Sequence, residues 1–214
     1  MLDSLLSRTL AKFGEPARKR ALAAGRHPWI SFPRPAFLFL LTNVRRLLGA
    51  DFEPDVRCPV CGVDEVGSAS FVDVGCGVAD KVALAADLGF EAHGIEVDPA
   101  AVRKARRAFP LRVCKATSCS PPPPVHEPGG GAMTLYPVDA LDFDFSGFAV
   151  IYFYRPFDDD RRQRALERRI WKQARPGAFV IACMAVTRPP RAFREVRALD
   201  GEPPDEARIY RRSW

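Results

Sequence analysis

The sequence predicts an α/β fold in which a mostly parallel sheet of seven strands lies between two layers of helices, a three-layer sandwich. Short apolar runs alternate with helical patterns along residues 69–185, as in successive strand–helix units of a parallel sheet. The run Phe148–Tyr154 is continuously apolar, which is typical of a central strand buried on both faces. Two further strands, over 193–199 and 207–212, are expected to complete the sheet as an antiparallel pair.

The first strand–helix unit contains a glycine turn. Residues 71–74 form a short apolar strand, Gly75 and Gly77 follow, and a helical pattern then continues to Leu88. Because glycine has no Cβ, the chain can turn sharply there and a ligand can approach the backbone closely. A helix that begins directly after the turn points unpaired N–H groups at the same place. The turn is therefore the first candidate for a binding site.

The second unit repeats this arrangement and ends its strand with a carboxylate. Residues 91–97 form the strand, Asp98 is the expected N-cap of the next helix, and Pro99 takes its first position. Glu96 lies 23 residues after Asp73, a spacing that suits a carboxylate holding ribose hydroxyls. These features predict a nucleotide-type crevice at the carboxyl edge of the sheet.

The identity of the nucleotide depends on position 80. A dinucleotide-binding turn needs a third glycine there, so that the helix packs closely beside a pyrophosphate, but this chain has Asp80. A carboxylate near a pyrophosphate disfavours NAD or FAD. S-adenosylmethionine has no phosphate and carries a sulfonium and an ammonium, so Asp73 and Asp80 suit it better. An NAD-linked oxidoreductase remains the alternative interpretation.

The stretch Asp73-Val74-Gly75-Cys76-Gly77 matches an acid, any residue, Gly, any residue, Gly. In this the chain resembles the class I S-adenosylmethionine-dependent methyltransferases, which have a Rossmann-like fold, and the resemblance covers roughly residues 69–185. Ala79 stands where the family often has a further glycine. The resemblance implies that S-adenosyl-L-methionine is the cofactor. It also implies that Asp73 holds the methionine end, that Gly75, Cys76 and Gly77 line the close approach, and that Glu96 binds the ribose.

The third acidic position follows the strand expected over residues 133–138, in which Pro137 suggests an edge or a bulge. In the family an acid at the close of this strand accepts a hydrogen bond from the adenine amino group. Asp139 matches that position, with Ala140 beside it as a further cofactor-binding residue. Asp142 and Asp144 are competing candidates, and each of the three acids could equally be a turn residue or a helix cap.

The fourth strand ends at Tyr154-Arg155-Pro156-Phe157. Methyltransferases that act on exocyclic amines of bases or on glutamine carry Asn or Asp, then Pro-Pro, then an aromatic residue at this edge. The polar group that would orient such an amine is absent, which argues against nucleobase N-methylation. Tyr154 is the candidate catalytic residue, because its hydroxyl could orient an acceptor or take a proton. The alternative is an aromatic wall of the cofactor pocket.

Composition divides the chain into an N-terminal helical extension over residues 1–50, a linker with a Cys-x-x-Cys pair over 51–68, and a methyltransferase domain over 69–214. An irregular insertion rich in proline and glycine is expected at 114–131. The net charge is +6, and residues 1–50 hold nine Lys or Arg against two acids, which gives 9 − 2 = +7. An acidic partner for this extension, RNA or an anionic surface, is one hypothesis, and a solvated helical face is the other.

The six cysteines are too few for a disulfide scaffold in a chain of 214 residues, which predicts a reduced, cytoplasmic protein. Cys58 and Cys61 form one Cys-x-x-Cys pair, half of a structural zinc site. Cys114, Cys119, His93 or His126 could supply further ligands, but there is no matching second pair, so we expect no metal. No apolar run is long enough for a membrane span, and we see no secretory signal.

The sequence therefore predicts a methyltransferase whose acceptor is unidentified, a protein side chain or a small molecule. The apolar fourth strand loosely resembles that of protein-lysine methyltransferases of the seven-strand class. An RNA methyltransferase is supported by the basic extension alone. A catalytically silent cofactor-binding or RNA-binding module and an NAD-linked oxidoreductase are the remaining alternatives. The oligomeric state is not assigned.

Overall fold

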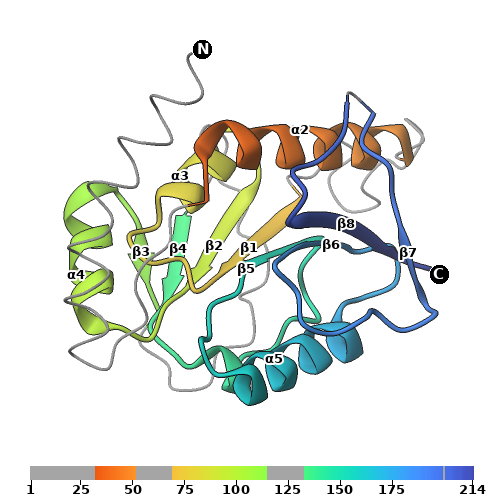
Figure 1. The fold of residues 1–214 in the computed structure, drawn as a ribbon. Coiled ribbons are helices and arrows are strands. Elements are labelled where there is room, and N and C mark those ends of the chain that lie inside the picture. Colours follow the sequence, from red (N-terminus) through yellow and green to blue (C-terminus); the bar gives the residue numbers. More distant parts are fainter. Residues whose placement is uncertain (1–31, 52–68, 115–132, 200) are drawn as a thin grey trace, which may run out of the picture.

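A single twisted sheet forms the centre of the molecule (Figure 1). The structure, a computed structural model, describes residues 32–51, 69–114, 133–199 and 201–214. Within these residues the sheet has eight strands in the order β3-β4-β2-β1-β5-β6-β8-β7. The strands are β1 (Ser70–Val74), β2 (Glu91–Ile95), β3 (Arg112–Val113), β4 (Met133–Tyr136), β5 (Val150–Tyr154), β6 (Phe179–Cys183), β7 (Phe193–Glu195) and β8 (Ala207–Arg212).

Helices cover both faces of the sheet (Figure 1). One face carries α2 (Arg34–Asp51), α3 (Asp80–Asp87) and α4 (Pro99–Ala108), and the other carries α5 (Asp160–Gln173) and the 3-10 helix η1 (Ala140–Asp142). A separate hydrophobic core fills each interface, because alternate residues of the buried strands point to opposite faces. The predicted three-layer, mostly parallel α/β fold is confirmed.

The central strands align their carboxyl ends. Strand β1 pairs in parallel with β2 on one side and with β5 on the other, and β6 continues the parallel order beyond β5. Val150 to Phe153 of β5 are fully buried, as the continuous apolar run predicts. The loops that leave β1, β2 and β5 therefore emerge at one edge of the sheet, which is where a crevice can form.

The ends of the sheet differ from expectation in three details. The count is eight strands rather than seven, because the two residues of β3 add a short edge strand beside β4. Strand β4 ends at Tyr136, so Pro137 lies after the strand and interrupts no ladder. Strand β7 covers only Phe193–Glu195, and β8 pairs antiparallel with both β6 and β7, as predicted for the closing pair.

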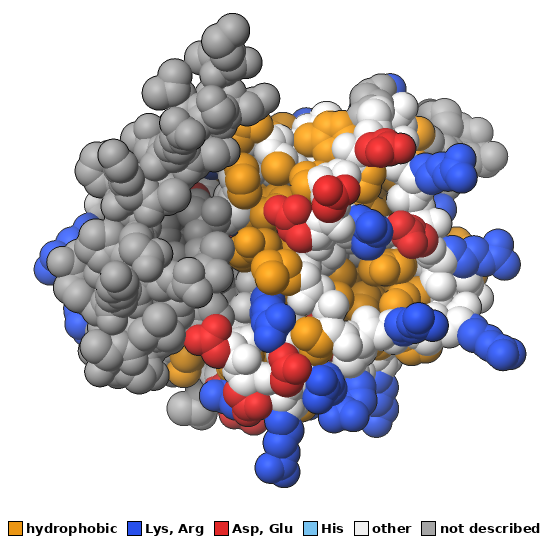
Figure 2. All heavy atoms as spheres, in the orientation of Figure 1, with side chains coloured by type: hydrophobic (Ala, Val, Ile, Leu, Met, Phe, Trp, Pro, Cys, Tyr) orange, Lys and Arg blue, Asp and Glu red, His pale blue; other side chains and the backbone are white. Residues whose placement is uncertain are grey.

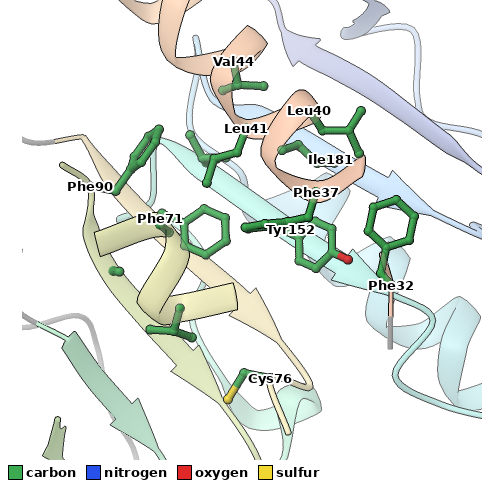
Figure 3. Packing of buried hydrophobic residues seen from close by; sticks show 14 of the residues in the cluster. Phe32, Phe37, Leu40, Leu41, Val44, Phe71, Cys76, Phe90, Tyr152 and Ile181 are labelled. Atoms are coloured by element: carbon green, nitrogen blue, oxygen red, sulfur yellow. The ribbon is translucent and has the colours of Figure 1, made fainter. Parts of the chain in front are cut away.

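Helix α2 packs directly on the sheet (Figure 3). Phe37 meets the rings of Phe71 and Tyr152 at centroid distances of 6.0 and 5.0 Å, and Leu40 and Leu41 are fully buried in the same core. This helix is the described part of the expected N-terminal helical extension. Phe32, just before the helix, meets Tyr154 at the carboxyl end of β5. Arg45, further along the helix, lies beside Gly89, which precedes β2, so α2 runs from the carboxyl edge of the sheet towards its amino edge. The helices expected over 1–25, Cys58, Cys61 and most of the 114–131 insertion lie outside the described residues.

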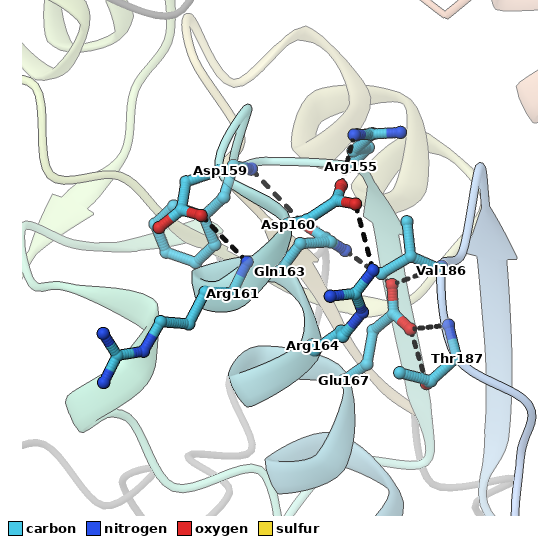
Figure 4. Close-up of polar contacts among 10 residues, drawn as sticks. Arg155, Asp159, Asp160, Arg161, Gln163, Arg164, Glu167, Val186 and Thr187 are labelled. Carbon is cyan, nitrogen blue, oxygen red and sulfur yellow. Dashed lines mark hydrogen bonds and ion pairs between the residues drawn. The ribbon is translucent and has the colours of Figure 1, made fainter.

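A buried carboxylate fixes the loop that follows β6 (Figure 4). Glu167 on α5 is fully buried, and one of its oxygens accepts hydrogen bonds from Gln163 Nε2 at 2.8 Å and from the backbone N–H of Val186 at 2.9 Å. The other oxygen accepts the N–H of Thr187 at 2.7 Å. A buried acid with this many donors is well satisfied. Glu167 thus connects α5 to the loop.

Among the described residues no helix is long and apolar enough to cross a membrane. The three cysteines within them, Cys76, Cys114 and Cys183, are all free.

Candidate functional site

A cavity of about 480 Å³ opens at the carboxyl edge of the sheet. Its volume falls in the range of small-molecule sites. All eight residues that the sequence singles out line it: Asp73, Gly75, Cys76, Gly77, Glu96, Asp139, Ala140 and Tyr154. The tertiary structure brings these positions together because they follow the ends of neighbouring parallel strands, β1, β2, β4 and β5.

Gly75 is required at its position for two reasons. Its φ of 78° lies in the left-handed region, which side chains rarely adopt. A Cβ added there would lie 2.6 Å from Cβ of Pro156, in the loop after β5. The loops after β1 and β5 therefore touch across Gly75, and this contact forms part of the cavity wall.

Ala79 marks a departure from the glycine expected in the family. It has a φ of 63° and serves as the N-cap of α3, with no side-chain cap. A left-handed conformation costs an alanine roughly 1–2 kcal/mol, because its Cβ crowds the following carbonyl. The turn has thus kept the backbone conformation that suits a glycine while carrying a methyl group.

Cys76 contributes packing rather than reactivity. Its Sγ lies over Gly94 of β2, where an added Cβ would come within 2.6 Å of the sulfur. The side chain is buried, and burial raises the pKa of the thiol well above its usual value. A thiol held in this way is a poor nucleophile, since the thiolate is the reactive form.

Glu96 is held by backbone N–H groups on both sides. One carboxylate oxygen accepts from Gly77 N at 2.9 Å, and the other accepts from Asp98 N at 2.7 Å. Each carboxylate oxygen has two lone pairs, so capacity remains for hydroxyl donors from a ligand. The glycine turn and the end of β2 are thereby joined into one rigid piece around Glu96.

Of the three competing acids after β4, only Asp139 lines the cavity. Its side chain also caps η1 by accepting from Leu141 N at 3.0 Å, and it forms an ion pair with Arg162 of α5. Asp142 is exposed, and Asp144 accepts from the N–H of Ser146 in a turn. Asp139 therefore combines the capping role and the cavity position that the sequence left as alternatives.

Asp73 is buried at the inner end of the cavity, with 3% of its surface exposed. Burial raises the pKa of its carboxyl to about 7, partly opposed by the positive charge of Lys81 and reinforced by Asp80 and Glu96. A cationic ligand group placed beside Asp73 would favour the ionised form. The site is thus poised to bind a cation.

Tyr154 ends β5 at the cavity and is partly buried, with its ring centroid 5.2 Å from that of Phe32. Burial is the main cause that raises the pKa of its hydroxyl, so the phenol stays protonated at neutral pH. The next residue, Arg155, has a φ of 35° and donates to Asp160 at 2.7 Å (Figure 4). Strained backbone of this kind is found frequently at functional sites.

Five polar residues line the cavity without being among the predicted site residues: Lys81, Asp98, Tyr152, Arg155 and Arg162. Lys81 had a readable signal, because it is the one charged residue in the otherwise apolar stretch from 81 to 86. Tyr152 lies within the apolar run of β5, where nothing in the sequence distinguishes it from a core residue. Arg162 reaches the cavity from α5, where its guanidinium carbon lies 4.2 Å from the ring centre of Phe157.

Neither a protein-family model nor a curated protein sequence matches the chain. Solved structures do match it. An RNA methyltransferase from Salinibacter ruber in complex with S-adenosyl-L-homocysteine is 19% identical, with a TM-score of 0.47, over 85% of this chain and 92% of that one. Magnesium protoporphyrin IX methyltransferase from Synechocystis, with bound S-adenosylmethionine, is 14% identical with a TM-score of 0.49, over 84% and 81%. The N-methyltransferase NodS from Bradyrhizobium japonicum is 16% identical with a TM-score of 0.49, over 85% and 98%.

Because the identities lie below 25% and the TM-scores below 0.5, the strand order and the cavity of this chain itself carry the argument. The parallel sheet closes with an antiparallel β8 inserted between β6 and β7, and its carboxyl edge carries a glycine turn and acids at successive strand ends. This is the fold of the class I S-adenosylmethionine-dependent methyltransferases, the fold that the sequence predicts.

Proposed function

We propose that the protein is an S-adenosylmethionine-dependent methyltransferase. The observation that carries the proposal is the convergence of three carboxylates on one cavity. Asp73 lies near the end of β1, Glu96 directly follows β2 and Asp139 follows β4, and all three line the same space of about 480 Å³. This spacing along the sheet edge supports contacts to the methionine, ribose and adenine parts of one extended ligand.

The residues present fit this cofactor better than a dinucleotide. Gly75 has a positive φ and lies in the cavity wall, where Pro156 fills the position that a Cβ would take, so the turn packs tightly against the loop after β5. Asp73 and Asp80 are both buried near the turn, so a pyrophosphate there would meet two carboxylates. A sulfonium and an ammonium would instead reduce the cost of burying these acids.

The bound cofactor would supply an activated methyl group. The protein's part is to position the donor and the acceptor, because proximity and alignment lower the barrier to an in-line displacement. We propose that Asp73 faces the ammonium, Glu96 the ribose hydroxyls and Asp139 the adenine amino group. Gly75, Cys76, Gly77 and Ala140 would form the walls. Because the pKa of Tyr154 is raised, its hydroxyl would orient an acceptor and would not remove its proton.

The proposed acceptor is a protein side chain or a small molecule, methylated in the cytoplasm. RNA is the second proposed class of acceptor, because the protein carries exposed positive charge. Most of the basic extension lies outside the described residues, but α5 adds an exposed row of cations at helical spacing, Arg161, Arg164, Arg168 and Lys172, and the exposed Arg175 follows the helix. In Figure 2 Lys and Arg side chains gather along the lower and right-hand sides of the molecule. A surface of this kind suits an acidic acceptor or partner.

A ligand titration tests the cofactor. We expect S-adenosylmethionine and S-adenosylhomocysteine to raise the melting temperature of the protein, and NAD to leave it unchanged. Stabilisation by NAD alone would overturn the proposal in favour of an oxidoreductase. Incubation of a cell extract with cofactor labelled in its methyl group then tests catalysis. Label should enter a product with the wild-type protein and be lost with Asp73→Asn, whereas a silent binding module would label nothing.

A further inference from the structure

The inner end of the cavity holds a buried polar cluster, which we define as Asp73, Lys81 and Tyr152. Asp73 and Tyr152 are register partners on β1 and β5, and Lys81 is the second residue of α3, the helix that follows β1. The three side chains lie on the face of the sheet that α2 and α3 cover. A carboxylate, an ammonium and a phenol thus share a space beneath an otherwise apolar layer.

Lys81 is unusual because it is a cation with 6% of its surface exposed. Burying a lysine carries a large desolvation cost unless anions compensate it. Its Nζ lies 3.3 Å from Oδ1 of Asp80, and Asp80 also lies 3.8 Å from Nε of Arg34 on α2. The Nζ of Lys81 also lies 3.5 Å from Oδ2 of Asp80, and its positive charge acts on the carboxyl of Asp73 as well, so Lys81 is the cation of this end of the cavity.

Tyr152 supplies an independent observation. Its side chain is 1% exposed, and its hydroxyl has no well-formed hydrogen bond among the residues that the structure describes. The buried thiol of Cys183 interacts with it, but a thiol is only a weak hydrogen-bond partner. Figure 3 shows the ring between Phe37, Phe71 and Phe32, with the oxygen directed away from the strand. An unmade hydrogen bond at a buried hydroxyl costs about 1–3 kcal/mol. Since Tyr152 lines the cavity, a ligand that contacted its hydroxyl would remove the cost.

We infer that Lys81 and Tyr152 bind the α-carboxylate of the cofactor's methionyl part, while Asp73 receives the α-ammonium. The inference rests on the proposed function and adds two residues to it. A zwitterion of one carboxylate and one ammonium is the chemistry that complements a cation, a hydroxyl donor and a carboxylate in one place. The Lys81–Asp80 pair by itself explains how Lys81 is tolerated, but it leaves the hydroxyl of Tyr152 unexplained.

Two ligands that differ only in the carboxylate separate this contact from general binding. We propose isothermal titration of S-adenosylmethionine and of its decarboxylated form, which keeps the sulfonium and the ammonium. Lys81→Met should lower the affinity for S-adenosylmethionine by about 10- to 100-fold, which corresponds to the loss of one charge-assisted hydrogen bond. The affinity for the decarboxylated form should change by less than about threefold. Lys104→Met, a lysine exposed on α4, is the matched control and should change neither affinity.

Tyr152→Phe gives a second readout that a structural role would not produce. The ligand-free variant should melt at or above the wild-type temperature, because it removes a poorly satisfied buried hydroxyl. The same variant should bind S-adenosylmethionine about 3- to 10-fold more weakly. Its affinity for the decarboxylated form should not change. If Lys81→Met fails to fold, these measurements on Tyr152→Phe decide the inference.

The outcomes distinguish the inference from the proposed function. Absence of binding of either ligand to the wild-type protein would overturn the proposed function, and the inference with it. If the wild-type protein binds both ligands and each variant lowers the two affinities equally, or lowers neither, the inference alone is overturned. The methyltransferase proposal would then still stand.

Discussion

The two halves of the cavity rim are built in different ways. The β1–β2 rim, residues 75–79 and 96–98, is held by contacts within the rim and with the end of β2: Gly75 and Cys76 donate their N–H groups to Ile95 O at 2.9 Å, and Gly77 and Asp98 donate to the carboxylate of Glu96. The β5–β6 rim, residues 155–159 together with the loop 184–192 that follows β6, is held by side chains of α5, and of these residues Arg155, Pro156 and Phe157 line the cavity. It depends on the Arg155–Asp160 pair and on Glu167 of α5.

This difference indicates which rim binds the cofactor and which rim selects the methyl acceptor. Contacts among its own residues and with the end of β2 fix the β1–β2 rim before any ligand arrives, which suits a constant ligand such as a cofactor. In the β5–β6 rim both Arg155 and Met184 have positive φ values, 35° and 53°, and Met184 is exposed. A rim shaped by long side chains can vary with few changes to the fold, and it is where an acceptor would be selected.

The largest effect is expected from breaking the contact between the two rims. Gly75→Ala should lower the free energy of unfolding by about 3 kcal/mol, since the methyl group meets Pro156 and the φ is unfavourable. Cofactor affinity should fall with it. Chemical denaturation measures the loss. The control is Gly49→Ala in α2, where nothing lies within 4 Å, and it should stabilise the protein by about 0.5–1 kcal/mol. Equal behaviour of the two variants would contradict the proposed contact.

The next largest effect is expected from removing Glu167, the side chain of α5 that holds the β5–β6 rim. Glu167→Ala should destabilise the protein by roughly 2–4 kcal/mol, because it leaves the partly buried N–H groups of Val186 and Thr187 without their acceptor. The variant should keep its affinity for S-adenosylhomocysteine at a temperature where it is folded. A large loss of cofactor affinity would show that the rims are not independent.

Asp73 gives a pH dependence to the β1–β2 rim. Because burial raises its pKa to about 7, the ionised fraction of the free protein rises about tenfold between pH 6 and pH 8. Affinity for S-adenosylmethionine should rise by up to the same factor, measured by calorimetry in matched buffers. Asp73→Asn should bind more weakly and show a flat profile. An unchanged profile in this variant would assign the titration to another group.

The same shift acts on folding in the opposite direction. The folded pKa of Asp73 lies above its ordinary value of 3.8, so its stabilising contribution is present below pH 3.8 and is lost as the pH rises towards 7. Burial lowers the pKa of His93 to about 4, so His93 adds stability as the pH rises from 4 to 6.5. The two contributions oppose each other over that window, so ligand affinity is the cleaner measurement.

The smallest effect sharpens the description of the glycine turn. Ala79→Gly should stabilise the protein by up to about 1 kcal/mol, because relief of the left-handed alanine slightly exceeds the added entropy of the unfolded chain. Ala83→Gly, in the same helix, should instead destabilise it by about 1 kcal/mol. If the backbone of the turn is strained in this way, thermal unfolding should show a higher melting temperature for Ala79→Gly and a lower one for Ala83→Gly. Destabilisation by both changes would contradict it.

The sequence carried local information well. The capping of α4 by Asp98 with Pro99 at the first turn was readable, because a cap and its helix lie within a few residues of each other. The order of strands and helices in the described residues was readable from alternating patterns. The errors lay at strand ends. Pro137 and the two residues of β3 depend on which neighbour a strand pairs with, and no local pattern contains that information.

By itself, the sequence determined the glycine turn, the acids at strand ends and the parallel order, because these are properties of residue type and short spacing. Only the tertiary structure decided that Asp139, rather than Asp142 or Asp144, reaches the cavity. It also placed Lys81 and Tyr152, whose buried hydroxyl is poorly satisfied, beside Asp73. The physical reason is that burial and contact between β1, β5 and α3 arise from packing across the sheet, which brings together residues nearly 80 positions apart.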